Sequence, residues 1–447
     1  MKGTHWVVAV GLALIAGPAQ AGAVTGDARL VTLKNGMRVI LAPDDRATAV
    51  DVAVWYESGA RFERTGKTGQ AHLFEHLMFR GSERYDSGEH RRRVRAEGGS
   101  SGAYATHDFT CFYQTLPSDA LELAFQLEAD RMTGLELTQE ALDSERRLVA
   151  DERARQATPI RRGLERLYAM AWNTHPYRGS LFGLERDLER LTLQDCKSFY
   201  RARFGPDRAV VTVVGHFESE QALELARRYF EPLKPAGGRD QALPADKPVD
   251  AERRAVEPGV TPVRIVMAGW RGPRRADRDW PELSLLATLL TRASDARLTR
   301  ALVVDPPLCL AVQGDMDSRR DASMFYLAAS VAPQADSAEV ESRLFGELGR
   351  LLVEPVGEEE LERAKRQIET AVWFGLQTSR GRAQALGTGQ MLAGDFQDLE
   401  RQLERIRACT PADLQRAARH LDPARRNVLW LKPSQDAMPT SDPGGRP

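Results

Sequence analysis

From residue 29 onward the chain alternates between short apolar runs and longer amphipathic stretches. Residues 30–42 hold Asn35-Gly36 between two apolar segments, a pattern typical of a tight β-hairpin. Residues 50–57, 104–116 and 209–214 are rich in β-branched or aromatic residues and predict further strands. Helices are predicted around His72, over residues 118–132, and over residues 138–156 behind the N-cap residue Thr138. Strands and helices in this mixture predict an α+β fold.

The pattern restarts after a polar stretch rich in proline and glycine at residues 236–258, which is typical of an interdomain linker. A shift of 219 residues brings similar side chains together, and it places Leu142, Arg147 and Val149 on Leu361, Arg366 and Ile368. We therefore predict two homologous domains, each an antiparallel-rich sheet packed with helices. They cover residues 22–235 and 259–433, and a disordered tail follows at residues 434–447.

The first 21 residues have the pattern of a secretory signal peptide. Lys2 precedes an apolar stretch at residues 6–16, and the small residues Ala19 and Ala21 follow it. The apolar stretch is shorter than the roughly 20 residues that span a bilayer. We expect cleavage after Ala21 and a periplasmic mature chain, with an uncleaved membrane anchor as the alternative. In that compartment the cysteines can either pair or remain four buried thiols; they are Cys111, Cys196, Cys309 and Cys409.

Composition and charge narrow the function classes only a little. The 447 residues are 42% hydrophobic and 28% charged, which is typical of a globular protein and excludes a disordered or fibrous chain. The 62 basic residues balance 63 acidic ones, so net charge gives no reason to expect nucleic-acid binding.

The strongest chemical signal is the sequence His-Leu-Phe-Glu-His at residues 72–76. On a helix, His72, Glu75 and His76 lie on one face, because positions three and four apart are neighbours. Two imidazoles at this spacing can bind one Zn²⁺ at about 2.0–2.1 Å, with the carboxylate beside the ion. This is the H-x-x-E-H motif of the inverzincins. The alternative is a solvated surface helix that carries no metal.

A catalytic zinc site needs a third protein ligand and an open fourth position. Glu152 lies on the helix predicted at residues 138–156, and Glu145 lies two turns earlier on the same face. We therefore predict one Zn²⁺ per chain, bound by His72, His76 and Glu152, with Glu145 orienting the site without binding the ion.

Several segments together identify a family resemblance: Gly69 to Gly81, the Glu145 and Glu152 pair, Gly98-Gly99 through Thr110, His175-Pro176-Tyr177, and Phe199-Tyr200 through Gly215. In these segments the chain resembles the pitrilysin/insulinase family of zinc peptidases. It is similar in length to the zinc-bearing subunit of mitochondrial processing peptidase and its bacterial two-subunit relatives. The resemblance implies a clamshell of two α+β halves around a peptide. It also implies that Glu75 is the general base, and that substrate pairs with an edge strand through Gly99, Gly102, Ala103 and Ala105.

The sequence departs from the family pattern at two places. Gly102 stands where members usually carry an asparagine that holds substrate. In the second domain, Val303 and Leu310 occupy the places of an Arg and a Tyr that single-chain members extend toward the substrate. The 219-residue shift also turns Glu145 and Glu152 into Ala364 and Ala371. The second domain is therefore predicted to be inactive, and a homologous partner without zinc ligands is expected to supply the Arg and Tyr.

The resulting prediction is a zinc-dependent endopeptidase that cleaves peptides or unfolded segments as the catalytic subunit of a heterodimer. One alternative is a non-catalytic scaffold subunit of the same superfamily, against which the intact zinc motif argues. Another is a self-sufficient homodimer in which Arg292, Arg297 or Arg300 replaces the missing donors, although solvated helix charges are the simpler interpretation of these arginines.

Overall fold

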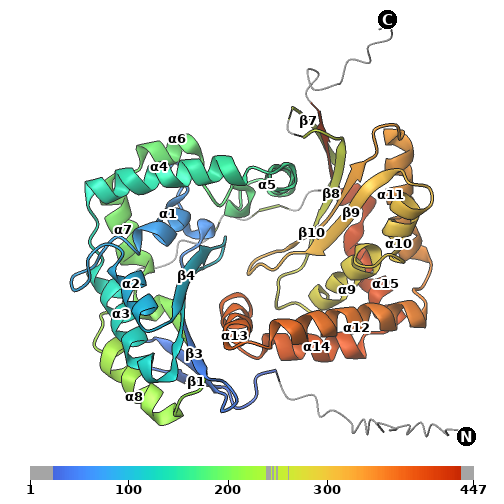
Figure 1. Ribbon diagram of the computed structural model, residues 1–447. Coiled ribbons are helices and arrows are strands. Elements are labelled where there is room, and N and C mark those ends of the chain that lie inside the picture. The colour runs from blue at the N-terminus through green and yellow to red at the C-terminus, as the bar shows by residue number, and fades with distance from the viewer. Residues whose placement is uncertain (1–23, 238–242, 244–245, 248–249, 260, 434–447) are drawn as a thin grey trace, which may run out of the picture.

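Two β-sheets, each packed with helices, make up the part of the chain that the structure describes (Figure 1). The structure is a computed structural model, and it describes residues 24–237, 243, 246–247, 250–259 and 261–433. The predicted signal peptide and C-terminal tail lie outside these residues. The two sheets with their helices confirm the predicted α+β fold.

The first sheet has six strands in the order β1-β2-β6-β3-β5-β4. Its only parallel pair among the described strands is β2 with β6. The central strands β3 and β6 are almost wholly buried because helices cover both faces of the sheet. Strand β4 forms one edge. The strands are β1 Arg29–Thr32, β2 Arg38–Pro43, β3 Ala49–Tyr56, β4 Ser100–Ala105, β5 Thr110–Pro117 and β6 Ala209–Gly215.

The second sheet repeats this arrangement with five strands in the order β7-β11-β8-β10-β9. Again one pair, β7 with β11, is parallel, and the other described pairs are antiparallel. The order therefore matches β2-β6-β3-β5-β4 of the first sheet, as expected of an internal repeat. The strands are β7 Arg253–Pro258, β8 Ile265–Arg271, β9 Cys309–Met316, β10 Met324–Val331 and β11 Asn427–Lys432.

The helices show the same repeat. Helices α4 and α12 each have 18 residues, and their bounds differ by the predicted shift of 219 positions. The first half holds α1 Gln70–Leu77, α2 Glu89–Ala96, α3 Leu121–Gly134, α4 Gln139–Gln156, α5 Pro159–Ala171, α6 Glu185–Arg190, α7 Leu193–Arg203 and α8 Ser219–Phe230. The second half holds α9 Trp280–Thr291, α10 Arg297–Thr299, α11 Ser337–Val353, α12 Glu358–Gly375, α13 Ser379–Ala393, α14 Asp398–Ala408 and α15 Pro411–Ala418. None of the described helices is long and apolar enough to cross a membrane.

Two expectations about element boundaries were wrong. The stretch predicted as a linker, 236–258, ends in strand β7, which alternates between half-buried and exposed residues because it pairs only with β11 at a sheet edge. The single strand predicted at residues 104–116 is two strands, β4 and β5. The turn between them forms because the Thr106 hydroxyl accepts hydrogen bonds from the backbone N–H groups of Asp108 and Phe109, at 3.1 and 3.0 Å.

The two halves exchange helices. Helix α5 of the first half packs on β8 and β11 of the second sheet, whereas α13 of the second half packs on β3 and β6 of the first (Figure 1). Both helices approach their sheets closely at a glycine. A Cβ atom at Gly163 would lie 2.2 Å from the sulfur of Met267, and one at Gly387 would lie 2.1 Å from Trp55. Each sheet therefore completes its core with a helix from the other half.

The four cysteines are buried free thiols: Cys111, Cys196, Cys309 and Cys409. Burial raises the pKa of each thiol, most of all for Cys111. Thiols in such surroundings are unreactive, and they act here as small core residues.

A polar contact also joins the halves, and it explains the His175-Pro176-Tyr177 motif. The carboxylate of Asp321 accepts two hydrogen bonds from Arg61, at 2.8 and 2.9 Å, and lies 3.1 Å from His175 Nε2. The Tyr177 hydroxyl accepts a hydrogen bond from the Asp321 backbone N–H at 3.2 Å and contacts Asp108. Burial favours the neutral carboxyl, but the bonds from His175 and Arg61 outweigh it and lower the pKa of Asp321 to about 2.

We expect Asp321→Asn to lower the free energy of unfolding by about 2 kcal/mol at pH 7, because the shift from 3.8 to about 2 stabilises the folded state. A lowered pKa gives stability that is present above pH 4 and is lost as the pH falls toward 2. Denaturant titrations at pH 7 and pH 2.5 should therefore show a difference between wild type and variant that shrinks at acid pH. Asp315→Asn, at the exposed pair with Arg292, serves as the control and should change little. A difference that stays constant with pH would contradict the assignment.

Candidate metal centre

Helix α1 begins at a tight turn that fixes its position. Gly69 precedes the helix with φ 92°, a left-handed conformation that favours glycine, and a Cβ there would lie 2.7 Å from the Phe182 carbonyl oxygen. The Glu63 carboxylate accepts hydrogen bonds from the backbone N–H groups of Gly69 and Ala71, at 2.8 and 2.7 Å. Burial raises the pKa of Glu63 to about 8, against the effect of these N–H donors. The turn and its carboxylate therefore set the start of the helix.

Helix α1 has one apolar face that packs in the core and one polar face that points toward α4 and β4. Leu73, Phe74 and Leu77 are buried in the core of the first half. His72, Glu75 and His76 lie on the face toward α4 and the edge strand β4, as the spacing predicted.

Helix α4 supplies the remaining carboxylates. It begins after Thr138, whose side chain accepts a hydrogen bond from the Ala141 backbone N–H at 3.1 Å, so the predicted N-cap is confirmed. Leu142 and Val149 are fully buried and pack α4 against the core beside α1. Because the helix repeats every 3.6 residues, this packing directs Glu145 and Glu152 toward α1.

The ligand atoms of His72, His76 and Glu152 all lie within 4.8 Å of one another. Oε2 of Glu152 is 3.6 Å from His72 Nε2 and 3.2 Å from His76 Nε2. Among the residues that the structure describes, these three form the single group of histidine, cysteine or acidic side chains that could hold a metal ion. Two imidazoles and one carboxylate are a donor set that suits Zn²⁺.

The surroundings of His72 fit a metal ligand. The residue is buried, yet within the described chain neither ring nitrogen makes a hydrogen bond. Buried polar atoms nearly always have a partner, so an unsatisfied imidazole needs an explanation. Its ring packs edge-on against Phe182, with 4.5 Å between the ring centroids, which fixes its orientation. A cation between His72, His76 and Glu152 would give Nε2 its partner, while Nδ1 lies on the side of the Glu75 carboxylate.

Glu145 orients His76 and is not one of the three candidate ligands. Its Oε2 is 3.0 Å from His76 Nδ1, which leaves Nε2 to face Glu152, and its other oxygen accepts a hydrogen bond from Arg80. Burial disfavours the charged form of both Glu145 and His76. The contact between them outweighs burial, with help from Arg80 at the carboxylate, so the pKa of Glu145 is lowered and the pKa of His76 is raised. The geometry is that of a carboxylate–histidine pair beside a metal ligand, which is the position predicted for Glu145.

Glu75 lies between the ligands and the sheet edge. Its Oε2 is 3.3 Å from His72 Nδ1 and accepts a hydrogen bond from the Ala105 backbone N–H at 2.8 Å. The bond ties the carboxylate to the end of β4. Glu75 is therefore held next to the candidate ligands, half-buried and within reach of a molecule bound there.

The four residues predicted to bind substrate lie in or beside β4. Gly102, Ala103 and Ala105 belong to this edge strand, and Gly99 immediately precedes it. Ala103 lines the same pocket as Glu75 and His76. A Cβ atom at Gly102 would lie 2.4 Å from the Tyr113 hydroxyl, so a larger residue there requires the Tyr113 side chain to move.

Two residues beside Glu152 were not predicted from the sequence. The Gln156 amide donates a hydrogen bond to Glu152 Oε1 and, through its own oxygen, accepts one from Arg161. Oε2 of Glu152 is thereby left to face the two imidazoles. Spacing on α4 could have pointed to Gln156, since it lies four residues after Glu152. Arg161 lies on α5, and no sequence pattern links it to the site.

We expect Gln156→Leu to weaken divalent-metal binding about 10- to 100-fold, because a ligand without its supporting hydrogen bond loses orientation. Competition with a chromophoric zinc chelator measures this affinity directly. Gln194→Leu, at an exposed glutamine on α7, is the matched control and should leave the affinity unchanged. An unaltered zinc affinity in Gln156→Leu would show that the hydrogen bond has no positioning role.

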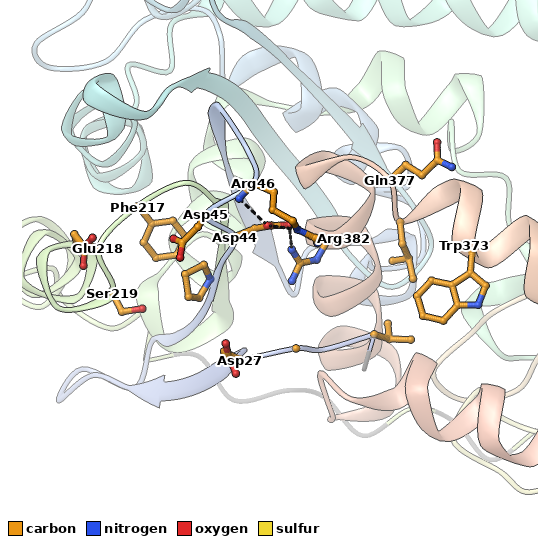
Figure 2. Close-up of a pocket in the computed structure, with 14 residues that line it drawn as sticks. Asp27, Asp44, Asp45, Arg46, Phe217, Glu218, Ser219, Trp373, Gln377 and Arg382 are labelled. Atoms are coloured by element: carbon orange, nitrogen blue, oxygen red, sulfur yellow. Dashed lines mark hydrogen bonds and ion pairs between the residues drawn. The ribbon is translucent and has the colours of Figure 1, made fainter. Parts of the chain in front are cut away.

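Two of the candidate ligands, His76 and Glu152, line a pocket of about 470 Å³. We call it the Arg91 pocket, and it is lined by Glu75, His76, Phe79, Arg80, Ser87, Gly88, Arg91, Ala103, Glu145, Leu148 and Glu152. A larger cavity of about 840 Å³ shares no lining residue with it. That cavity lies where α12 and α13 meet the first half, and Arg382 donates to Asp44 there at 2.7 Å (Figure 2).

The second half carries none of this chemistry at the equivalent positions. Ala364 and Ala371 of α12 take the places of Glu145 and Glu152. Val303 is half-buried, and Leu310 is 58% exposed on β9. Neither side chain can donate a hydrogen bond at the positions where an Arg and a Tyr were expected from the family pattern. Arg297 makes two hydrogen bonds of 2.8 Å to Glu360, and Arg292 pairs with Asp315.

Comparisons with known proteins agree that the two halves differ, with the candidate metal ligands in the first half alone. Residues 38–184 match the family described as Insulinase (Peptidase family M16), and residues 190–368 match its Peptidase M16 inactive domain. The chain is 28% identical to zinc protease PqqE of Helicobacter pylori over 413 residues, which cover 90% of this chain and 92% of that protein.

Two further comparisons extend the likeness. A crystal structure of a protease from Helicobacter pylori superposes with a TM-score of 0.84 at 28% identity and covers 91% of this chain and 99% of the other. An Arabidopsis thaliana chain named "Probable mitochondrial-processing peptidase subunit beta, mitochondrial" is 23% identical over 268 residues, which are 59% of this chain and 50% of that one. With the H-x-x-E-H helix, the remote glutamates and the repeated α+β halves in place, the chain belongs to the insulinase (M16) family of zinc peptidases.

Proposed function

We propose that this chain is a zinc-dependent endopeptidase that cleaves peptides or unfolded protein segments. The observation that carries the proposal is the convergence of His72, His76 and Glu152, with the Glu75 carboxylate beside them. The naming of relatives as zinc proteases supports it. An ion held by these three side chains would act as a Lewis acid and make a water molecule more acidic.

The chain's own residues then have separate tasks. Glu75 takes a proton from the attacking water and passes it to the leaving amine, as a general base and then a general acid. The bond from Ala105 keeps the carboxylate in place during both transfers. Glu145 and Gln156 hold His76 and Glu152 in their orientations. Substrate adds to the free edge of β4, beside Ala103 and Ala105, by backbone hydrogen bonding.

We further propose that a homologous partner completes the active site. Val303 and Leu310 have no side-chain donor, so the second half offers no group at these places to stabilise the developing oxyanion. A partner with an Arg and a Tyr at these positions would supply one. The mature chain would work in the periplasm, since the first 21 residues resemble a signal peptide.

Mixing the chain with a homologue that lacks zinc ligands but carries the Arg and Tyr should raise turnover of a fluorogenic peptide about 10²- to 10³-fold, the usual effect of oxyanion donors. The same homologue with Arg and Tyr changed to Lys and Phe is the control and should give little gain. Full turnover by the purified chain alone would reject the heterodimer and favour a self-sufficient enzyme.

A further inference from the structure

We propose that the Arg91 pocket selects peptides with an aspartate or glutamate side chain close to the scissile bond, and that Arg91 recognises this carboxylate. The inference rests on the proposed peptidase function and adds a substrate class to it. Arg91 belongs to α2 and lines the same pocket as Glu75, His76 and Glu152, so a side chain next to the reacting bond reaches it.

Arg91 is held in position without an anion. Its guanidinium carbon lies 4.0 Å from the centroid of the Phe79 ring, a cation–π contact that orients the group toward the pocket. Within the described residues no carboxylate forms an ion pair with this guanidinium, and it makes no hydrogen bond there. An oriented, unpaired guanidinium matches a carboxylate with two parallel hydrogen bonds.

The other arginine that lines the pocket, Arg80, is already paired with a carboxylate, as are Arg93 and Arg131 nearby. Arg80 donates to Glu145 and Ser144, and Arg93 donates to Glu89 at 2.7 Å. Arg131, which lies 5.1 Å from the same Phe79 ring, is bonded to Glu128. Burial and the charges of Arg131 and Arg95 lower the pKa of Arg91, and the opposing charge of Glu145 does not outweigh them.

The acidic residues of the pocket do not reverse this preference, because each has a partner. Glu145 is bonded to Arg80 and faces His76, Glu75 accepts from Ala105, and Glu152 faces the two imidazoles of the metal centre. The walls beside Arg91 are the Phe79 ring and Leu148, which is 42% exposed. These walls suit the methylene groups of a glutamate, while the guanidinium binds its carboxylate.

The test uses peptides with one cleavage site in which each flanking position carries Glu, Gln or Lys in turn. For the zinc-loaded enzyme with its partner we expect kcat/KM to be about 10- to 100-fold higher for Glu than for Gln at one position, since hydrogen bonds between charged groups are strong. Arg91→Glu should reverse the order so that Lys exceeds Glu. Arg92→Glu makes the same charge change at the adjacent residue. Both arginines are exposed, but Arg92 does not line the pocket, so this variant should keep the wild-type order.

Equal rates for Glu and Gln at every position, or an order that Arg91→Glu leaves unchanged, would overturn the inference. Binding to the Glu75→Gln variant, measured by fluorescence anisotropy, separates this from failure of the proposed function. If no peptide is cleaved, the peptidase proposal fails. Recognition by Arg91 would still be supported if the Glu peptide binds more tightly than the Gln peptide and Arg91→Glu abolishes this difference. Absence of that difference in binding would reject recognition as well.

Discussion

Replacing Glu75 with glutamine should nearly abolish peptide hydrolysis while zinc content stays at one ion per chain. The amide side chain of the variant has the same shape and could still contact Ala105, but it cannot take a proton from water at neutral pH. Proton transfer by a positioned side chain contributes about 10²- to 10⁴-fold to rate, and we expect a loss of that size in kcat. Stopped assays with a fluorogenic peptide, together with metal analysis of the same sample, give both quantities.

Glu140→Gln is the matched control for this variant. It makes the same chemical change in the first turn of α4, at an exposed residue away from the ligands, and should leave kcat and zinc content unchanged. A Glu75→Gln enzyme that retains wild-type turnover would remove Glu75 from the chemistry. A variant that loses zinc as well would show that the carboxylate has a structural role at the metal.

Replacing Glu152 with alanine should weaken zinc binding by more than about 100-fold. Loss of an outer hydrogen-bond partner alone costs about 10- to 100-fold in metal affinity, and this change removes a candidate ligand itself. The two imidazoles that remain, on one helix, would leave the ion two protein ligands instead of three. Competition with a chelator of known affinity, repeated at several pH values, measures the loss.

Asp151→Ala is the control for the ligand variant, since this neighbour on α4 is exposed and shortens the side chain in the same way. It should bind zinc as wild type does. A Glu152→Ala chain with unchanged zinc affinity would mean that another group holds the ion, and a circular dichroism spectrum identical to wild type excludes unfolding as the cause of any loss.

The site could be foreseen from sequence to the extent that helix periodicity controls it. Spacings of three and four residues put His72, Glu75 and His76 on one face, and seven residues put Glu145 and Glu152 on another. No spacing says that these two helices pack together; the family resemblance implied it, and the buried residues of both helices achieve it.

The features that escaped prediction depend on contacts between distant parts of the chain. Arg161 reaches the site only because α5 follows α4 and packs across to the second sheet. Strand β7 looked like linker because three of its six residues are charged and it ends at Pro258, a composition that a strand at a sheet edge can have. Gly102 lies against Tyr113 of the neighbouring strand, a contact that no local pattern reveals.

The most direct measurement is anomalous diffraction at the zinc absorption edge from crystals grown with one equivalent of zinc. We predict a single strong peak per chain, about 2.0–2.2 Å from a ring nitrogen of His72, a ring nitrogen of His76 and a carboxylate oxygen of Glu152. A peak elsewhere, or none between these three side chains in a fully occupied crystal, would contradict the metal centre on which the proposed peptidase depends.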